Sequence, residues 1–281
     1  MNMTRGTDML KRLALIAVLG GALVVFVLGV IDDLRALRPE TKLAGQLVAA
    51  LLLVVTGVRL DLFIDNPWIS GAITVGWIVM ITNAMNLLDN MDGLSAGVSI
   101  IAAFSFFVCV WPHGDAFVCV LLMVFAGSVA GFLYHNLSPA RIFMGDAGAM
   151  FCGYLLATVA VLGTFHTEST PSRASVAAPV LALGVPLFDT LSVIYIRWRR
   201  GESIMKGDKR HFSHRLVDLG MSPRQAVEFI FLVAGVTGLG GALLPQVGLT
   251  GTVIILAQTG GVFLLIVLLM NAGKRSGESN R

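Results

Sequence analysis

Residues 69–97 read ISGAITVGWIVMITNAMNLLDNMDGLSAG, an apolar run that ends in amides and acids. Its first part, 69–88, has no charged side chain, and about 20 apolar residues cross the hydrocarbon core of a bilayer as a helix. Asp89 and Asp92 then follow at an i,i+3 spacing, which on a helix places like charges on one face and is favourable only with a cation between them. The alternative is a polar turn at Asp92-Gly93.

The rest of the chain has the composition of a membrane protein. Of 281 residues, 56% are hydrophobic and 13% are charged, against about 25% charged in soluble domains. We predict an all-α, polytopic integral membrane protein, with residues 1–281 forming a single membrane-embedded domain and with cytoplasmic active-site loops. About nine transmembrane helices are expected, at 13–31, 43–58, 69–88, 94–111, 116–134, 148–163, 174–196, 225–243 and 251–270.

Basic residues set the predicted orientation. With the N-terminus outside, fifteen of the 20 Lys and Arg residues fall in cytoplasmic loops, as the positive-inside bias requires. The chain is therefore expected in the inner (plasma) membrane, in contact with the lipid bilayer. No basic patch is interleaved with exposed aromatic residues, so nucleic acid is not an expected partner. The three cysteines form no disulfide or zinc pattern.

The same orientation places several further acids on the cytoplasmic side. Asp32 and Asp33 end the first helix, where the helix dipole disfavours acids and calls for a compensating cation. That cation is a neighbouring basic residue (Arg35, Arg38 or Lys42) or, in the sharper interpretation, a metal ion or a phosphate-bound magnesium. Asp146 is either a helix N-cap or part of a site at a helix start that favours phosphate.

Two segments late in the chain add polar groups. Asp189 is an intramembrane acid and a functional candidate by default; the alternative is a hydrogen bond to an Asn or Ser of a neighbouring helix. His211 and His214 lie next to Lys209, Arg210 and Arg215. Such a cluster is typical of a site that binds phosphate oxygens. Two structural expectations complete the pattern: a short strand or hairpin at 58–67, and a close helix seam at Ala126, Gly127, Ala130 and Gly131.

Four motifs, in order, resemble the polyprenyl-phosphate N-acetylhexosamine-1-phosphate transferases, known as bacterial glycosyltransferase family 4. They are IDDLRALRPETKL (31–43), NAMNLLDNMDGLSAG (83–97), HNLSPARIFMGDAGAM (135–150) and DKRHFSHRL (208–216). The resemblance implies a Mg²⁺-dependent enzyme, with Mn²⁺ as an alternative ion. Its substrates would be undecaprenyl phosphate and a UDP-N-acetyl sugar. A homodimer is one assembly that the resemblance allows. The sequence LLDNMDGL (87–94) favours an N-acetylglucosamine transferase over the phospho-N-acetylmuramoyl-pentapeptide transferase.

The resemblance also implies residue roles. Asp32 and Asp33 match the catalytic acids, one of which orients or deprotonates the lipid phosphate. Asp146, with Asp89, is implied to bind the metal. The substrate-binding set is implied to be Asn83, Asn86, Asp89, Asp92, Asn136, Arg141, Arg210, His211 and His214.

This sequence departs from the family pattern at two places. Members usually have about two more helices before the Asp-Asp helix, and the histidine motif reads HFSH where many members have three histidines in four positions. Three alternatives stay open: the muramoyl-pentapeptide transferase, a truncated inactive paralogue, and an ion-coupled transporter. Transfer through a covalent aspartyl intermediate is an alternative mechanism.

Overall fold

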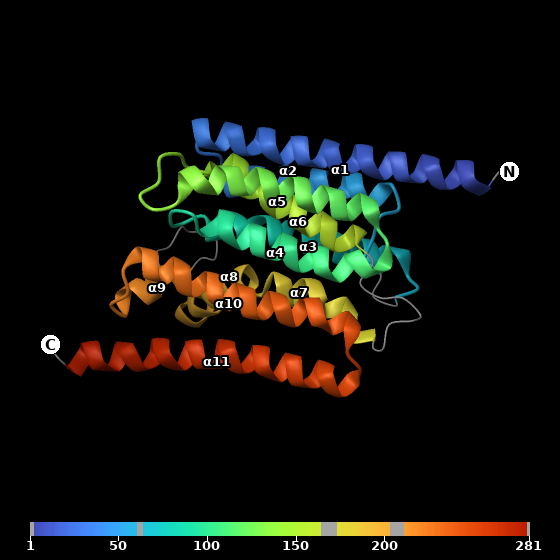
Figure 1. Cartoon of the computed structure of the whole chain (residues 1–281). Helices are drawn as coiled ribbons and strands as arrows, with labels where there is room; N and C mark the ends of the chain where they lie inside the picture. The colour runs from blue at the N-terminus through green and yellow to red at the C-terminus, as the bar shows by residue number, and fades with distance from the viewer. Residues whose placement is uncertain (1–2, 61–63, 164–172, 203–210, 280–281) are drawn as a thin grey trace. The chain divides into compact units, whose positions relative to one another are not determined.

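The computed structural model describes residues 3–60, 64–163, 173–202 and 211–279 (Figure 1). Every regular element in these ranges is a helix, which confirms the predicted all-α class. The chain divides into two compact units, and the division falls within α3, after Asn86.

The first unit holds α1 (Met3–Leu34), α2 (Pro39–Val55), most of α3 (Pro67–Leu88) and α6 (Gly145–Leu162). Helix α1 packs along both α2 and α6. Gly29 of α1 lies directly against the backbone of Asp146 and Ala147, with no space for a side chain between them. The end of α1 is thereby held against the first turn of α6.

The second unit begins with α4 (Leu94–Val110), the 3-10 turn η1 (Trp111–His113) and α5 (Ala116–Asn136). After α6 of the first unit, the chain returns to the second unit. There it forms η2 (Arg173–Ala177), α7 (Ala178–Ala182), α8 (Gly184–Arg200) and α9 (Phe212–Asp218). It ends with α10 (Pro223–Leu243), η3 (Leu244–Gln246) and α11 (Leu249–Ser279). Helix α4 packs against α5 and α10, and Phe231 of α10 lies on Gly97 of α4.

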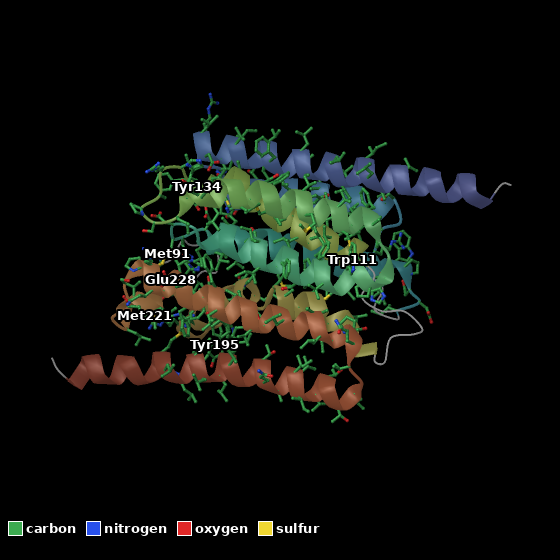
Figure 2. The ribbon with its side chains drawn as sticks, viewed as in Figure 1. Met91, Trp111, Tyr134, Tyr195, Met221 and Glu228 are labelled. Atoms are coloured by element: carbon green, nitrogen blue, oxygen red, sulfur yellow. The ribbon has the colours of Figure 1, made fainter. Side chains whose placement is uncertain are left out.

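The helices of the second unit share two ends, which Figure 2 marks with labelled side chains. Met91, Met221 and Glu228 lie at one end of its helices, whereas Trp111 lies toward the other (Figure 2). Ser222 begins α10 as an N-cap, accepting a hydrogen bond from the Gln225 N–H while the Gln225 side chain accepts one from the Ser222 N–H. This capping box defines the start of α10.

The chain is a multi-pass membrane protein. In the described ranges, seven helices are long and apolar enough to cross a membrane, and a bent pair, Ser175–Ala182 with Gly184–Arg200, would make an eighth. Helix α2, which corresponds to the predicted segment 43–58, has 17 residues and is not among them. Outward-facing leucines on α1 and α11, such as Leu23 (62% exposed) and Leu268 (60% exposed), supply the apolar surface that lipid would cover.

The predicted helix at 174–196 is not continuous. The pair bends by 69° between Ala182 and Gly184. Pro186 lies four residues after Ala182, and a proline ring clashes with the carbonyl of the residue four positions earlier. A straight helix through Leu183 is therefore disfavoured.

The predicted strand or hairpin at 58–67 is wrong for its described residues, 58–60 and 64–66, which form no strand. The reason is competition from side chains: the Leu60 N–H donates to Thr74 Oγ1 at 2.9 Å, and the Leu60 carbonyl accepts from Ser70 Oγ at 2.8 Å. Both backbone groups of Leu60 are thus satisfied by the start of α3.

The predicted small-residue seam on α5 is also wrong within this chain. Gly127 and Gly131 are exposed, with open space where a side chain would stand. Helix α5 instead packs through larger side chains, Leu122, Phe125 and Val129 among them. Burial of these side chains removes more apolar surface from the solvent than the glycines could.

Candidate active site

Asp33, the last acid of α1, binds the start of α6. Its Oδ1 accepts a hydrogen bond from the Asp146 N–H at 2.8 Å, and its Oδ2 accepts one from the Ala147 N–H at 3.1 Å. These amides belong to the first turn of a helix, where N–H groups lack partners within the helix and a negative charge is favoured. The positive end of α6 therefore offsets the unfavourable position of Asp33 at the end of α1.

Gly145 permits this contact. Its φ is +64°, a left-handed conformation that side chains disfavour, and a Cβ there would lie 2.7 Å from Asp33 Oδ2. A larger residue would displace the carboxylate from the two amides. The glycine of the Met-Gly-Asp turn is thus a requirement of the Asp33–α6 contact.

Asp32 and Asp146 share one cation, the ammonium group of Lys42. Lys42 Nζ pairs with Asp32 Oδ2 and donates to Asp146 Oδ2 at 2.5 Å. Asp32 is 8% exposed, and its other oxygen, Oδ1, accepts from the Leu37 N–H at 2.6 Å. Burial lowers the pKa of Lys42, but its hydrogen bonds to Asp146 and Asp32 outweigh burial, so the pKa is raised above the ordinary value. The compensating cation expected from the sequence is Lys42 in this structure.

Two asparagines of α3 lie beside this cluster. Asn86 Nδ2 donates to Asp146 Oδ1 at 2.9 Å, which fixes the second oxygen of that carboxylate. Asn83 exchanges hydrogen bonds with the buried Gln46 of α2, at 2.5 Å from Asn83 Nδ2 and 3.3 Å from Gln46 Nε2. The acidic cluster, which we define as Asp32, Asp33, Lys42, Asn86 and Asp146, is thus held by three helices and the first turn of α2.

Magnesium is the ion that the sequence motifs predict for the acidic cluster. In the described ranges, no three His, Cys, Asp or Glu side chains gather as a metal cage. Protein Mg²⁺ sites, however, commonly use one or two carboxylates and take their remaining ligands from water and substrate phosphates. Asp32 and Asp146 direct one oxygen each at a single cation, which is the donor chemistry that such a site needs. The residues present therefore fit the ion.

Several predicted site residues lie in the second unit, where they connect two loops. Asp92 Oδ2 accepts from the Ala140 N–H at 3.0 Å. Asn136 Oδ1 accepts from the Gly93 N–H at 3.0 Å, and its Nδ2 donates to the Ile142 carbonyl at 2.8 Å. These contacts join the turn before α4 to the segment after α5. Asp89 is half-buried in that turn, and the Arg141 side chain is exposed.

The histidine motif is anchored by Asp189. His211 Nδ1 lies 2.8 Å from Asp189 Oδ2, and the Phe212 N–H donates to Asp189 Oδ1 at 2.5 Å. Both His211 and Asp189 are buried. The hydrogen bond predicted for Asp189 exists, but its partners are a histidine and a helix-start amide in place of an Asn or Ser. Ser213 Oγ further donates to Asn90 Oδ1 at 2.5 Å, which ties α9 to the turn before α4.

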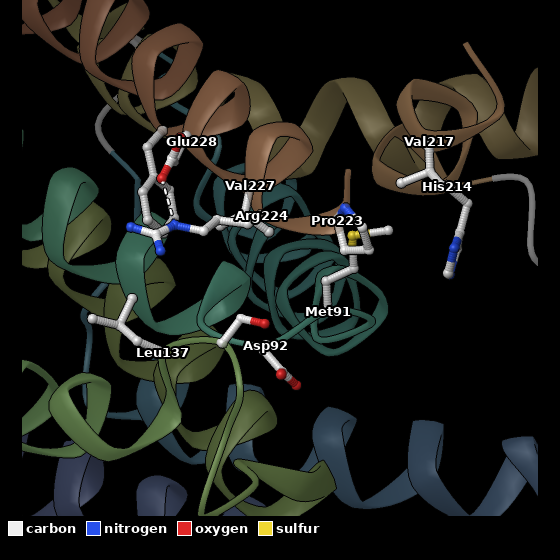
Figure 3. A pocket seen from close by; sticks show the side chains of 11 residues that line it. Met91, Asp92, Leu137, His214, Val217, Pro223, Arg224, Val227 and Glu228 are labelled. Carbon is white, nitrogen blue, oxygen red and sulfur yellow. Dashed lines mark hydrogen bonds and ion pairs between the residues drawn. The ribbon is translucent and has the colours of Figure 1, made fainter. Parts of the chain in front are cut away.

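A cavity of about 650 Å³ opens among the turn before α4, the segment after α5, α9 and the start of α10 (Figure 3). We call it the α9–α10 cavity. Asp92, His214 and Arg224 line it, together with apolar side chains such as Met91 and Phe231. Arg224 Nε pairs with Glu228 Oε1 at 2.9 Å, and both side chains are largely exposed. The volume lies within the roughly 300–1,000 Å³ of small-molecule sites.

The structure thus groups Asp32, Asp33, Asn86 and Asp146 in one cluster, and Asp92 with His214 in one cavity. Asn83 lies next to the first group, and His211 supports the second through α9. Arg210 lies outside the described residues. Sequence reasoning missed Gln46, Asn90, Ser213, Arg224 and Glu228. Gln46 carried a usable signal, because a polar side chain within an apolar helix is a functional candidate.

Comparisons with known proteins agree with the motifs. The model of glycosyl transferase family 4 matches residues 15–164. The "Probable undecaprenyl-phosphate N-acetylglucosaminyl 1-phosphate transferase" of Bacillus subtilis is 34% identical, over 94% of this chain and 74% of its own length. The "Decaprenyl-phosphate N-acetylglucosaminephosphotransferase" of Mycolicibacterium smegmatis is 34% identical, over 96% of this chain and 73% of its own.

A phospho-N-acetylmuramoyl-pentapeptide-transferase of Shouchella clausii is more distant, at 31% identity over 65% of this chain and 58% of its own length. The prediction that this chain is more similar to the N-acetylglucosamine-1-phosphate transferases than to the muramoyl-pentapeptide transferases is therefore confirmed. On the family match and on these identities, this chain belongs to glycosyl transferase family 4.

Proposed function

We propose that this chain transfers N-acetylglucosamine 1-phosphate from UDP-N-acetylglucosamine to undecaprenyl phosphate and releases UMP. The reaction would take place at the cytoplasmic face of the inner (plasma) membrane and begin the synthesis of a cell-envelope polysaccharide, such as a teichoic acid or a lipopolysaccharide. The names of the two relatives at 34% identity support the sugar and the polyprenyl acceptor. The proposed chemistry rests on one observation, that Asp32 and Asp146 share a single cation, the ammonium group of Lys42.

In the proposed reaction, an oxygen of the lipid phosphate forms a bond to the sugar-bearing phosphorus of the UDP-sugar. The bond from that phosphorus to the bridging oxygen breaks, and UMP leaves with the electron pair. The second pKa of a phosphate monoester is about 6, so the attacking oxygen is largely deprotonated at neutral pH. We therefore assign Asp32 mainly to positioning the lipid phosphate, with proton acceptance as a minor contribution.

Asp33 has a different role in this proposal. Each of its oxygens accepts a helix amide of α6, which makes it a positioning residue for Asp146. Neither oxygen is without a donor, and a carboxylate so engaged is a poor nucleophile. This geometry favours direct transfer over a covalent intermediate on Asp33.

Magnesium bound to the acidic cluster would be held by Asp32 and Asp146, and it would supply Lewis-acid neutralisation of the diphosphate charge. Asp89 stays a predicted further ligand. Lys42 holds the carboxylates of Asp32 and Asp146 close together, and Asn86 fixes the orientation of Asp146. In the second unit we assign Asp92 and His214, which line the α9–α10 cavity, to the nucleotide sugar.

The proposal is tested with purified protein in proteoliposomes, by measuring UMP release from a panel of UDP-sugars. We expect release from UDP-N-acetylglucosamine only when undecaprenyl phosphate and a divalent cation are both present. Preference for UDP-N-acetylmuramoyl-pentapeptide would assign the chain to the muramoyl branch. Absence of release from every donor would contradict the proposal and favour an inactive paralogue.

A further inference from the structure

A second cavity, of about 550 Å³, lies between α8, α9 and α11 in the second unit. We call it the arginine cavity, because Arg199, Arg200 and Arg215 line it. No carboxylate is among the described residues that line it, so its lining carries three positive charges. Val267 and Met270 of α11 form an apolar wall, and Tyr195 of α8 also lines the cavity.

The Arg215 side chain is held in this cavity by a hydrogen bond. Its Nη2 donates to Ser192 Oγ at 2.6 Å, and Ser192 Oγ in turn donates to the Asp189 carbonyl at 2.9 Å. Arg215 Nε is buried and has no hydrogen-bond partner among the described residues. Burial lowers the pKa of Arg215, an effect that the charge of Asp189 opposes, and a guanidinium remains protonated at neutral pH. Arg215 lines the cavity, and an anion bound there would compensate the positive charge of its guanidinium group.

Arg199 and Arg200 add charge at the rim. They lie in the last turn of α8, are exposed, and form no ion pair with a carboxylate in the described part of the chain. Arginine at a helix end near a membrane surface is ordinary and by itself indicates only orientation. The distinguishing feature is that Arg215 approaches the same space from another helix, so that guanidinium groups from two helices converge.

The surroundings of the cavity select the kind of anion. Helices α8 and α11 touch where the rings of Phe188 and Phe263 stack, with centroids 4.7 Å apart. Beyond this contact, α11 presents Leu264 and Leu268 outward, 58% and 60% exposed. An anion with acyl chains would lay them on these leucines while arginines bind its phosphate, because guanidinium groups pair with phosphate through two hydrogen bonds.

We propose that the arginine cavity binds the phosphate of an anionic membrane phospholipid, at residues different from those assigned to the transfer reaction. The bound lipid stabilises the position of α9, because Arg215 directly follows His214 in that helix and its side chain also bonds Ser192 of α8. The position of the histidine motif thereby depends on the lipid composition of the membrane.

The test titrates the detergent-solubilised full chain with phosphatidylglycerol and with phosphatidylcholine, and counts bound lipids by native mass spectrometry. We expect preferential retention of phosphatidylglycerol, which the R199Q/R200Q double variant weakens roughly 30-fold, at about fivefold per lost arginine. Because both side chains are exposed, the variant should fold, and circular dichroism checks this. The R35Q variant, which removes one exposed arginine elsewhere, should bind phosphatidylglycerol as the wild type does.

Two competitors identify the source of the phosphate. Millimolar inorganic phosphate should leave the bound phosphatidylglycerol in place, since it lacks acyl chains. Displacement by inorganic phosphate would overturn the lipid assignment in favour of a free-anion site. Stoichiometric displacement by undecaprenyl phosphate would reassign the cavity to the acceptor substrate, and equal binding of both phospholipids would overturn the proposal altogether.

Discussion

Asp33 and Asp146 are joined through the backbone: the N–H of Asp146 donates to Asp33 Oδ1 at 2.8 Å, while the side chain of Asp146 turns to Lys42 and Asn86. One acid thus fixes the backbone from which the other extends. This relationship gives adjacent acids at 32 and 33 separate tasks, since Asp32 shares the Lys42 cation and Asp33 holds the α6 helix start.

Replacing Asp33 with Asn should destabilise the protein by about 1 kcal/mol or more, because the amide nitrogen would face a helix N–H and the charge at the helix start would be lost. UMP release should fall as Asp146 loses its position. Thermal unfolding in detergent and UMP release measure the two effects. The matched Asp65→Asn variant, at an exposed loop position, should change neither; an unchanged midpoint for Asp33→Asn would contradict the capping role.

Replacing Lys42 with Met should lower the rate of transfer but also lower the Mg²⁺ concentration that gives half-maximal activity. Without the ammonium group, Asp32 and Asp146 repel each other, and a divalent cation relieves more unfavourable charge than in the wild type. Lys42→Arg retains the charge and serves as the control. A higher magnesium requirement of Lys42→Met than of the wild type would refute this role of Lys42.

The raised pKa of Lys42 also predicts a pH dependence. A group whose pKa is higher in the folded protein contributes stability that is fully present below its unfolded value, about 10.4 for lysine, and is lost as pH rises through the folded value. The stability difference between wild type and Lys42→Met should therefore be constant from neutral pH to about pH 9. It should shrink above the unfolded value, and a change centred near neutrality would exclude this assignment.

The contact between Asp189 and His211 predicts a non-additive pair of substitutions. If Asp189 acts by orienting His211, then Asp189→Asn and His211→Gln should each reduce UMP release, and the double variant should lose no more than His211→Gln alone. Additive losses would show that Asp189 acts independently of the histidine. Because Asp189→Asn keeps an oxygen acceptor for the Phe212 N–H, circular dichroism should show a retained fold.

Much of this organisation could be predicted from the sequence, because apolar run length and motif order are properties of the chain itself. The long apolar runs predicted the helices, and the four motifs predicted the family that the comparisons show. The 69° bend at Leu183 was missed because the apolar composition continues across it, although Pro186 carried the signal. The strand expected at 58–67 failed because alternation cannot reveal that Ser70 and Thr74 take the Leu60 backbone groups.

The site was predicted less completely than the fold. Acids at 32, 33 and 146 were recognised individually, but that Asp33 binds backbone while Asp32 binds a cation depends on how α1 and α6 pack. The sequence likewise left open which basic residue pairs with the acids, since Arg35 and Arg38 are nearer to them along the chain than Lys42 is. Convergence of residues distant in sequence, such as Arg215 with Arg199, could not be predicted at all from the spacing.

Asp32 and Asp146 are proposed to form a cation-dependent transfer site, and UMP release by the Asp146→Asn variant is the decisive measurement. The assay compares the variant with the wild type, using UDP-N-acetylglucosamine, undecaprenyl phosphate and a magnesium titration. We predict that Asp146→Asn, and likewise Asp32→Asn, abolishes release at every magnesium concentration while the fold is retained. Full activity of either variant, or wild-type release that persists after chelation of divalent cations, would refute the assignment of these two acids.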